Sequence, residues 1–178
     1  MDRSEPGQCT PLHSGALLRV EVVRRSDLWS GAEVTDEALV SAVRAAFAAA
    51  GAAARRDVTL VLSCDDEVRT LNKTWAGKDR ATNVLSFPAG AAPGEEEGAL
   101  GDIVLARETL SREAANSGIS FQQHASHLVV HGLLHLLGYD HGSDADAAVM
   151  EGLETEILTQ LGYPDPYAIK TAEYASGQ

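Results

Sequence analysis

The hydrophobic and polar positions of this chain follow two different periods, which predicts a mixture of strands and helices. Partial alternation in residues 16–25 and a compact apolar run in residues 57–64 predict two strands. Shorter extended runs at residues 83–87 and 103–106 predict two more. We therefore expect a central sheet of about four strands.

Apolar residues recur at helical spacing between and after these strands. Each helical segment begins at a capping or acidic residue or ends at a glycine, as helices commonly do. The predicted helices occupy residues 35–50, a segment that begins at residue 65, and residues 107–116, 120–137 and 143–161. Strands and helices in this order predict an α+β or α/β domain in which helices pack against the sheet.

The chain length indicates a single domain. With 178 residues and 18.8 kDa, the protein is large enough for one sizeable core. Residues 1–16 are rich in Pro, Gly and Ser and are predicted to be loose, while residues 89–99 form a predicted acidic loop. We expect the domain to cover residues 17–162 and residues 163–178 to form a C-terminal tail.

The charge distribution limits the partners that this protein can bind. Lys and Arg number 14 against 26 Asp and Glu, which gives a formal net charge of −12. A protein of this charge does not hold nucleic acid by a generally basic surface. Residues 1–80 carry 11 basic and 12 acidic side chains, whereas residues 81–178 carry 3 and 14. A polyanionic partner should therefore approach the first half of the chain.

Cysteine content and hydropathy predict a cytoplasmic protein. Cys9 and Cys64 are the two cysteines, which excludes a disulfide scaffold or a cysteine-based zinc knuckle. The N-terminal residues lack the apolar core of a signal peptide. The longest apolar run, residues 45–54, is too short to span a membrane. We expect a reduced cytoplasmic location and no membrane partner.

The most informative pattern is a cluster of histidines near residue 131. His131 and His135 are one helical turn apart, so both imidazoles lie on one face and can share an ion. Gly138 can end the helix and turn the chain back, which lets His141 supply a third nitrogen. Three protein ligands with one open position are typical of catalytic zinc. The alternative is that these histidines are hydrogen-bonded core residues of an apolar helix.

The other histidines and the glycine that follows His131 limit the kinds of reaction that this cluster can support. His127 lies one turn before His131 and is either a ligand or a supporting residue, whereas His124 and His13 are interpreted as structural or surface residues. The spacing H-x-x-x-H-x-x-G-x-x-H is that of metzincin peptidases. Those enzymes need Glu directly after the first histidine as general base, and this chain has Gly132 there. Peptidase activity is therefore disfavoured.

The same residues carry a resemblance to a known family. Residues 131–141 fit the pattern H-G-x-L-H-L-x-G-Y-D-H at every fixed position. Over residues 18–162 the chain resembles the YbeY family of bacterial endoribonucleases, the rRNA maturation factors. The other matching blocks are Leu71-Asn72, Gly77-Lys78-Asp79, residues 82–88, residues 100–103, and Met150, Glu154 and residues 156–158.

The resemblance implies an α+β fold with a central sheet, a metal site at one edge, and a zinc-dependent endoribonuclease directed at single strands. It implies His131, His135 and His141 as ligands of one zinc ion. It also implies a role in processing ribosomal RNA, notably the 3′ end of the small-subunit RNA, and in ribosome quality control. Expected partners are single-stranded and ribosomal RNA, with a ribosomal protein or a GTPase of ribosome assembly as further candidates, and no DNA.

One position departs from the family pattern L-N-x-x-Y-R-G-K-D. Ala76 stands where the family has an arginine that is regarded as essential, so either a neighbour compensates or activity is reduced. Residues 69–80 contain four basic side chains and are the candidate source of positive charge for a phosphodiester. These side chains are Arg69, Lys73, Lys78 and Arg80. Trp75 either stacks on an unpaired base or fills core space.

The candidate catalytic residues are His131, Lys78, Arg80 and Asp140, and no residue is an obvious general base. Asp140 and Asp102 are each interpreted as orienting a ligand or bonding to the backbone. The sequence leaves open whether water or the RNA 2′-hydroxyl attacks. Nickel or copper would also suit three imidazoles. A zinc-stabilised ribosome-assembly factor with little catalysis is the main alternative function, and a metallopeptidase is a weaker one.

Overall fold

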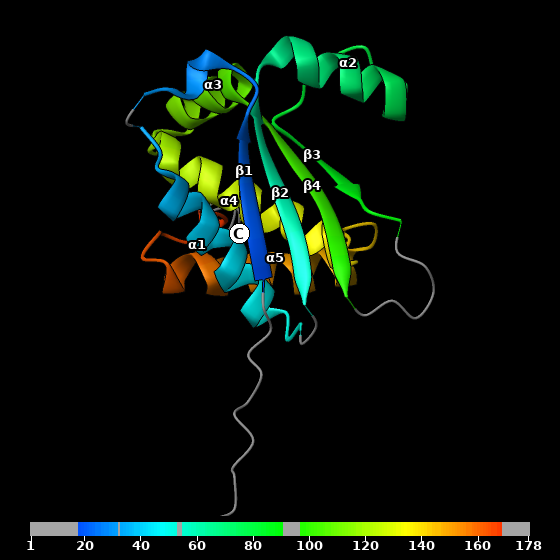
Figure 1. Ribbon diagram of the computed structural model, residues 1–178. Coiled ribbons are helices and arrows are strands. Elements are labelled where there is room, and N and C mark those ends of the chain that lie inside the picture. The colour runs from blue at the N-terminus through cyan, green and yellow to red at the C-terminus, as the bar shows by residue number, and fades with distance from the viewer. Residues whose placement is uncertain (1–17, 32, 53–54, 91–96, 169–178) are drawn as a thin grey trace, which may run out of the picture.

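The computed structural model describes residues 18–31, 33–52, 55–90 and 97–168. Strands and helices alternate in the first half, and three helices follow the last strand (Figure 1). The elements are β1 (Leu18–Arg24), the 3-10 turn η1 (Asp27–Trp29), α1 (Asp36–Ala49), β2 (Arg56–Ser63), α2 (Asp65–Ala76), β3 (Val84–Pro88), β4 (Gly98–Ala106), α3 (Arg107–Ser117), α4 (Phe121–Leu136) and α5 (Asp144–Gln160).

The four strands form one mixed sheet in the order β1-β2-β4-β3. Strands β1, β2 and β4 are parallel, and β3 pairs antiparallel with β4 at an edge of the sheet. The antiparallel pair places Val84 opposite Leu105 and Pro88 opposite Gly101. The expected α+β architecture with a central four-stranded sheet is confirmed.

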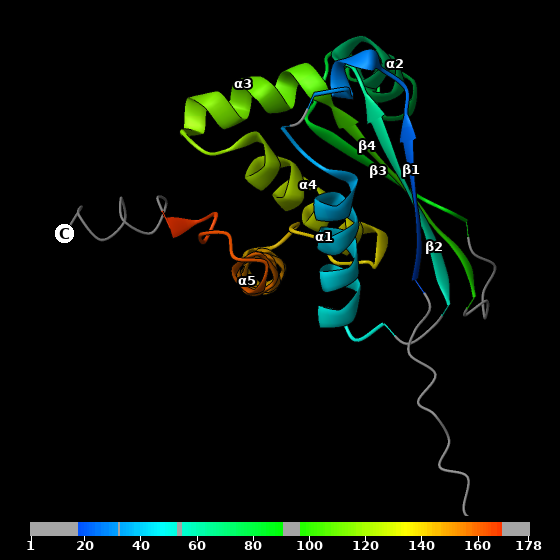
Figure 2. The same ribbon diagram turned by 60° about the vertical axis from the view of Figure 1, so that its left-hand side comes forward.

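Helices cover the two faces of the sheet unequally. Helices α1 and α4 lie together on one face, and α5 packs against both of them on the side away from the sheet (Figures 1 and 2). Helix α2 lies at one end of the opposite face, where its buried Val68 packs with Val104 and Ala106 of β4. Helix α4, which carries His131 and His135, is therefore enclosed between the sheet and α5.

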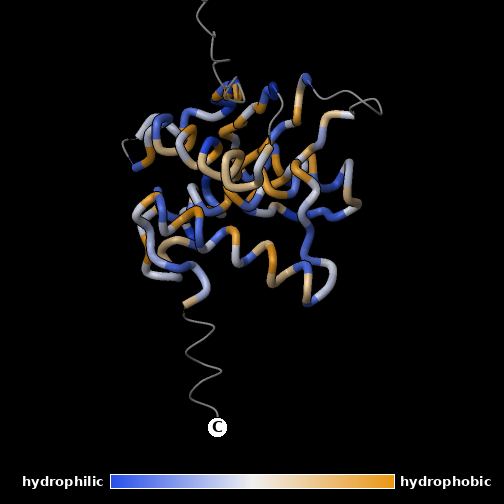
Figure 3. The backbone as a smooth tube through the Cα atoms, turned by 90° about the horizontal axis from the view of Figure 1, so that it is seen from below, coloured by the Kyte–Doolittle hydropathy of each residue, from blue (hydrophilic) through white to orange (hydrophobic). Residues whose placement is uncertain are grey.

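Alternation along the strands explains where the main core forms. In β2 the buried residues Val58, Leu60 and Leu62 face the helices, while Asp57, which points to the other side of the strand, is exposed. Helix α4 contributes Val129, among other apolar residues, to the same core. Figure 3 shows hydrophobic stretches toward the middle of the molecule, while many connecting segments at its rim are hydrophilic.

The largest difference from the sequence prediction is the start of β4. We expected this strand at residues 103–106 and a loop over residues 89–99, but β4 begins at Gly98. Its first residues have low intrinsic strand preference and become a strand because Gly98 and Ala99 pair with Arg56 and Asp57 of β2. Residues 91–96 of the predicted loop lie outside the described residues.

Gly101 in this strand has a structural role that a larger residue could not take. Its φ of +145° favours glycine, and a Cβ atom there would overlap the backbone oxygen of Phe87 and lie 2.9 Å from Leu136 Cδ2. Gly101 thus lets β3 and the end of α4 approach β4 closely. This approach brings the edge strand next to the histidine cluster.

The predicted domain limits stay a prediction. Residues 1–16 and 169–178 lie outside the described residues. Within the described part of the predicted tail, the Tyr163 hydroxyl accepts a hydrogen bond of 3.0 Å from Gln122 on α4. No helix in the described part of the chain is long and apolar enough to cross a membrane.

Candidate metal centre and adjoining cationic pocket

Helix α4 places two imidazoles side by side at its C-terminal end. The helix begins at the N-cap Ser120, whose hydroxyl accepts a hydrogen bond from the backbone N–H of Gln123. His131 and His135 follow one turn apart, and their Nε2 atoms are 3.1 Å from each other. The predicted pairing of these side chains on one helix face is confirmed.

A tight turn after the helix adds the third imidazole. Gly138 has a φ of +92°, and the Tyr139 backbone N–H donates to the Leu134 oxygen at 3.0 Å, which closes the helix end. His141 then lies with its ring centroid 5.6 Å from that of His131 and 5.0 Å from that of His135. One ring nitrogen from each of the three histidines lies within 4.8 Å of the others.

The donor set fits a divalent metal ion. His131 and His135 use Nδ1 for contacts within the protein, to the Glu154 carboxylate at 2.8 Å and to the Tyr139 backbone oxygen at 3.0 Å. Their Nε2 atoms therefore remain for a shared ligand. In a tetrahedral zinc site, two nitrogen ligands of the same ion are about 3.3 Å from each other. The Nε2 atoms of His131 and His135, which are 3.1 Å apart, are close to this separation. The three histidines could thus bind a metal ion.

The electrostatic environment keeps His135 in the form that binds metals. Its partial burial, followed by the neighbouring His131 and His141, lowers the pKa of the His135 imidazole. Only a neutral imidazole can donate its lone pair to a metal ion. The site therefore disfavours the protonated form that would compete with metal binding.

Sequence reasoning gave no role to a buried carboxylate beside this cluster. The Glu154 side chain on α5 is only 1% exposed. It contacts His131 and His127, and it accepts a hydrogen bond from the Tyr167 hydroxyl. Burial acts to raise the pKa of Glu154, but these three hydrogen bonds outweigh it and lower that pKa to about 2. Its signal in the sequence was an acidic residue within the apolar stripe formed by Met150, Ile157 and Leu158.

The histidine cluster opens into a pocket of about 490 Å³. Residues of β3 form one wall, and the end of α4 with the following turn forms the other. Asp140 lines this pocket, and its Oδ1 atom accepts a hydrogen bond of 2.8 Å from the backbone N–H of His141. This contact matches the backbone-bonding alternative for Asp140, and a catalytic role stays a prediction.

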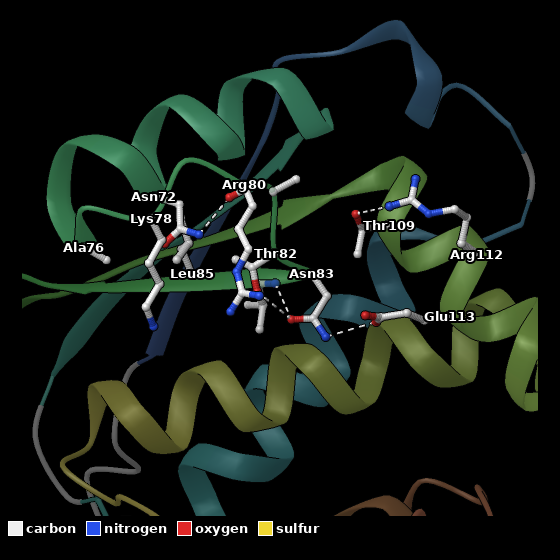
Figure 4. Close-up of a pocket in the computed structure, with 12 residues that line it drawn as sticks. Asn72, Ala76, Lys78, Arg80, Thr82, Asn83, Leu85, Thr109, Arg112 and Glu113 are labelled. Carbon is white, nitrogen blue, oxygen red and sulfur yellow. Dashed lines mark hydrogen bonds between the residues drawn. The ribbon is translucent and has the colours of Figure 1, made fainter.

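A second pocket of about 440 Å³ adjoins the first, because Val84 and Leu85 of β3 line both. In Figure 4, Lys78 and Arg80 extend from the segment after α2 toward α4. Arg112 of α3 lies at the far side of the same pocket, close to the Thr109 hydroxyl. We call this space the cationic pocket. A negatively charged polymer could extend from the histidines into the cationic pocket.

Ion pairs distinguish the four basic candidates of residues 69–80. Arg69 and Lys73 both contact the carboxylate of Asp79, at 2.7 and 2.9 Å. Hydrogen bonds from Lys73 and then Arg69 lower the pKa of Asp79, which therefore stays ionised and paired. In the part of the chain that the structure describes, neither Lys78 nor Arg80 forms a side-chain ion pair, so their charges face the cationic pocket. The Glu113 carboxylate also lines this pocket, where it contacts Asn83 and His124.

Ala76 and Trp75 are the last two residues of α2. Ala76 lines the cationic pocket together with Lys78 and Arg80. An arginine at this position, as in the family pattern, would therefore lie next to these two side chains. Trp75 is 73% exposed, so of its two alternatives the one that it fills core space was wrong. Its ring packs edge-on against Phe87 at 6.1 Å between centroids and leaves most of the indole accessible.

The structure also explains why glycine follows His131 here, where the metzincin pattern has glutamate. Gly132 is buried where α4 meets the sheet, and its oxygen accepts a hydrogen bond of 3.0 Å from the Ser86 hydroxyl. A Cβ atom at Gly132 would lie 2.9 Å from Ile103 Cγ2 and 3.0 Å from Ser86 Oγ. A glutamate at this position would therefore point into the sheet instead of into the pocket beside the histidines.

Comparisons with known proteins show the family to which this chain belongs. The family model described as Endoribonuclease YbeY matches residues 28–162. The Endoribonuclease YbeY of Rhodopseudomonas palustris strain BisB18 is 48% identical over 153 residues, which cover 83% of this chain and 91% of that protein. The corresponding protein of strain HaA2 is 43% identical over 167 residues, which cover 89% and 86% of the two chains.

A solved structure supports the fold independently. A Thermotoga maritima protein whose solution structure is known aligns with a TM-score of 0.54 and 19% identity, and the alignment covers 89% of this chain and 96% of that one. At this identity the likeness concerns the fold alone. The family match and the identity to the two curated proteins together show that this chain belongs to the YbeY family of endoribonucleases.

Proposed function

We propose that this protein is a zinc-dependent endoribonuclease that cuts single-stranded RNA and acts in ribosomal RNA processing, including maturation of the small-subunit RNA 3′ end and ribosome quality control. One observation carries the proposal. Three imidazoles that converge on one point adjoin a pocket lined by Lys78 and Arg80, and residues of the edge strand β3 line both spaces. The ribosomal RNA role is supported by family membership.

His131, His135 and His141 would hold the zinc ion through one ring nitrogen each. When bound, zinc supplies a Lewis acid and lowers the pKa of water. The protein contributes the fixed orientation of the rings, because Tyr139 and Glu154 occupy the Nδ1 atoms of His135 and His131. Asp140 contributes by bonding the backbone N–H of His141 and so fixing the turn that carries it.

Lys78 and Arg80 would bind the RNA backbone beside the metal pocket. Negative charge increases on the phosphoryl group in the transition state, and cations positioned there stabilise it. The two pockets share Val84 and Leu85, so a strand that crosses β3 would reach both the histidines and these cations. Trp75 offers an exposed aromatic face on which an unpaired base can stack.

The charge of the whole chain indicates which kind of partner the protein would need. A net charge of −12 opposes a polyanion except near its local cationic pocket. A ribosomal protein or a GTPase of ribosome assembly would provide the docking that this pocket alone does not. We expect no DNA or membrane partner, and a cytoplasmic location stays a prediction from the sequence.

Ala76 favours a second candidate function. Because the family arginine is absent at the cationic pocket, the protein could act as a zinc-stabilised ribosome-assembly factor with little catalysis. The substitution His131→Ala separates the two functions. Loss of RNA cleavage with a retained fold supports the endoribonuclease. A large fall in thermal stability with unchanged RNA handling supports the assembly factor.

The direct test is cleavage of a labelled single-stranded RNA by zinc-loaded protein and by the variants Lys78→Ala and Arg80→Ala. We expect each variant to lose about tenfold in rate, which corresponds to about 1.4 kcal/mol of transition-state stabilisation, and to keep its zinc. Arg44→Ala, at an exposed site on α1, is the matched control and should cleave normally. Equal rates for all four proteins would refute the assignment of the cationic pocket.

A further inference from the structure

The buried carboxylate of Glu154 needs an explanation beyond packing. It lies on the face of α5 that also buries Met150, Ile157 and Leu158, and its side chain is 1% exposed. An ionised carboxylate is expensive to bury unless hydrogen-bond donors surround it. A methionine or leucine would fill the same stripe without that cost, so the carboxylate points to a role toward its polar partners.

The partners of Glu154 converge from two other segments. Oε1 lies 2.8 Å from His131 Nδ1, and Oε2 lies 2.8 Å from His127 Nε2. The Tyr167 hydroxyl donates to the same Oε2 atom. An ionised carboxylate can only accept hydrogen bonds, so all three partners donate. His131 therefore carries its proton on Nδ1, and the Nε2 lone pair is directed at the other two histidines.

His131 and His135 are thus oriented by different kinds of group. The Nδ1 atom of His135 contacts the neutral backbone oxygen of Tyr139, whereas that of His131 contacts a charged side chain. A carboxylate partner fixes the ring and increases the basicity of its free nitrogen more than a neutral acceptor does. His127 and Tyr167 satisfy the second oxygen and hold the carboxylate in one position.

We propose that Glu154 is a positioning residue that sets the tautomer and ring orientation of His131 for metal binding, with His127 and Tyr167 fixing its carboxylate. The inference rests on the proposed metal binding by His131, His135 and His141. It assigns a function to α5, which supplies none of these three ligands. It also gives His127 a place as a supporting residue, one of the two alternatives that its spacing left open.

The test measures zinc affinity by competition with a chromophoric chelator, for wild type and three variants. Glu154→Gln keeps the shape of the side chain but replaces one acceptor oxygen by a donor, and we expect zinc affinity to fall about 10- to 100-fold. Tyr167→Phe removes one donor to the carboxylate and should weaken zinc binding less. Glu156→Gln lies exposed on the same helix and should bind zinc as wild type does.

Two readouts separate this role from a merely structural one. The d–d absorption of Co²⁺-loaded protein should change in Glu154→Gln and stay unchanged in Glu156→Gln. Nitrogen-15 NMR of the metal-free wild type should show the His131 proton on Nδ1, a result that does not require any variant to fold. A proton on Nε2, or unaltered zinc affinity in Glu154→Gln, would overturn the inference. Wild-type protein that binds no zinc would instead refute the proposed function on which it rests.

Discussion

Single residues decide which chemistry this helix can support. His131 and His135 alone would suit either a peptidase or a nuclease metal site. Gly132 between them packs against Ile103 and Ser86, so no side chain at this position can reach the metal pocket. The glycine therefore removes the peptidase general base and at the same time lets α4 approach the sheet.

The close approach at Gly132 predicts an unusual effect of a single methyl group. Gly→Ala within a helix normally stabilises by up to about 1 kcal/mol. At Gly132 the new Cβ atom would lie 2.9 Å from Ile103 Cγ2, so we expect Gly132→Ala to lower the free energy of unfolding by about 1–3 kcal/mol. Gly152→Ala on α5, where nothing lies within 4 Å, is the control and should stabilise. Chemical denaturation measures both, and equal stabilisation would contradict the packing.

At the scale of elements, α2 and the segment after it supply the positive charge of the site. Asp79 divides these charges into two groups. Arg69 and Lys73 share the single carboxylate of Asp79 as their partner, while Lys78 and Arg80 face the cationic pocket. Within the described part of the chain, the segment therefore has two free cations that line the pocket and two paired cations that do not line it.

This division predicts that removing Asp79 strengthens RNA binding. Asp79→Asn would free two cations beside the pocket, so affinity for single-stranded RNA should rise. The slope of log affinity against log salt should become steeper by up to about 1.4, the value for two added phosphate contacts on a single strand. Glu37→Gln changes the net charge equally but lies on α1. Fluorescence anisotropy at several salt concentrations measures the effect, and identical behaviour of both variants would show that only overall charge matters.

The absent arginine gives a gain-of-function prediction. Ala76 is exposed at the C-terminal end of α2, where a cation is also favourable to the helix dipole. Ala76→Arg would place a guanidinium at the cationic pocket, and we expect RNA cleavage to increase about tenfold or more, since a hydrogen bond to a charged group contributes about 1.5–3 kcal/mol. Single-turnover cleavage assays measure this. An unchanged rate would mean that Lys78 and Arg80 already provide the required charge.

Local patterns predicted the elements better than their arrangement. Helical spacing placed His131 and His135 on one face, and Gly138 correctly marked the turn that brings His141 back. The start of β4 at Gly98 depends on pairing with β2, which the residues of that segment do not encode locally. Glu154 was missed as a site residue for a similar reason, because its role depends on how α5 packs against α4.

At the scale of the whole molecule, a small cationic region lies on the surface of a strongly acidic protein. The net charge is −12, and residues 81–178 carry most of it. Long-range repulsion therefore opposes RNA everywhere except near the cationic pocket. Under the proposed function, such a molecule would need either a high local concentration of RNA or a protein partner to reach its substrate.

This charge balance predicts weak and salt-sensitive binding of naked RNA. If Lys78 and Arg80 each contact one phosphate, log affinity should fall with log salt at a slope of about −1.4. Binding to a single-stranded oligonucleotide, measured between low and physiological ionic strength, tests this. Tight binding that does not change with salt would show that the contacts are not the ionic ones described above.

The decisive measurement is zinc content and cleavage of single-stranded RNA on one preparation, for wild type and His131→Ala. The proposed function predicts one zinc ion per wild-type chain, cleavage that is lost on chelation and restored by zinc, and neither zinc nor cleavage in His131→Ala. Wild-type protein that carries no zinc, or that cleaves RNA equally well after chelation, would contradict a metal-dependent endoribonuclease built on His131, His135 and His141.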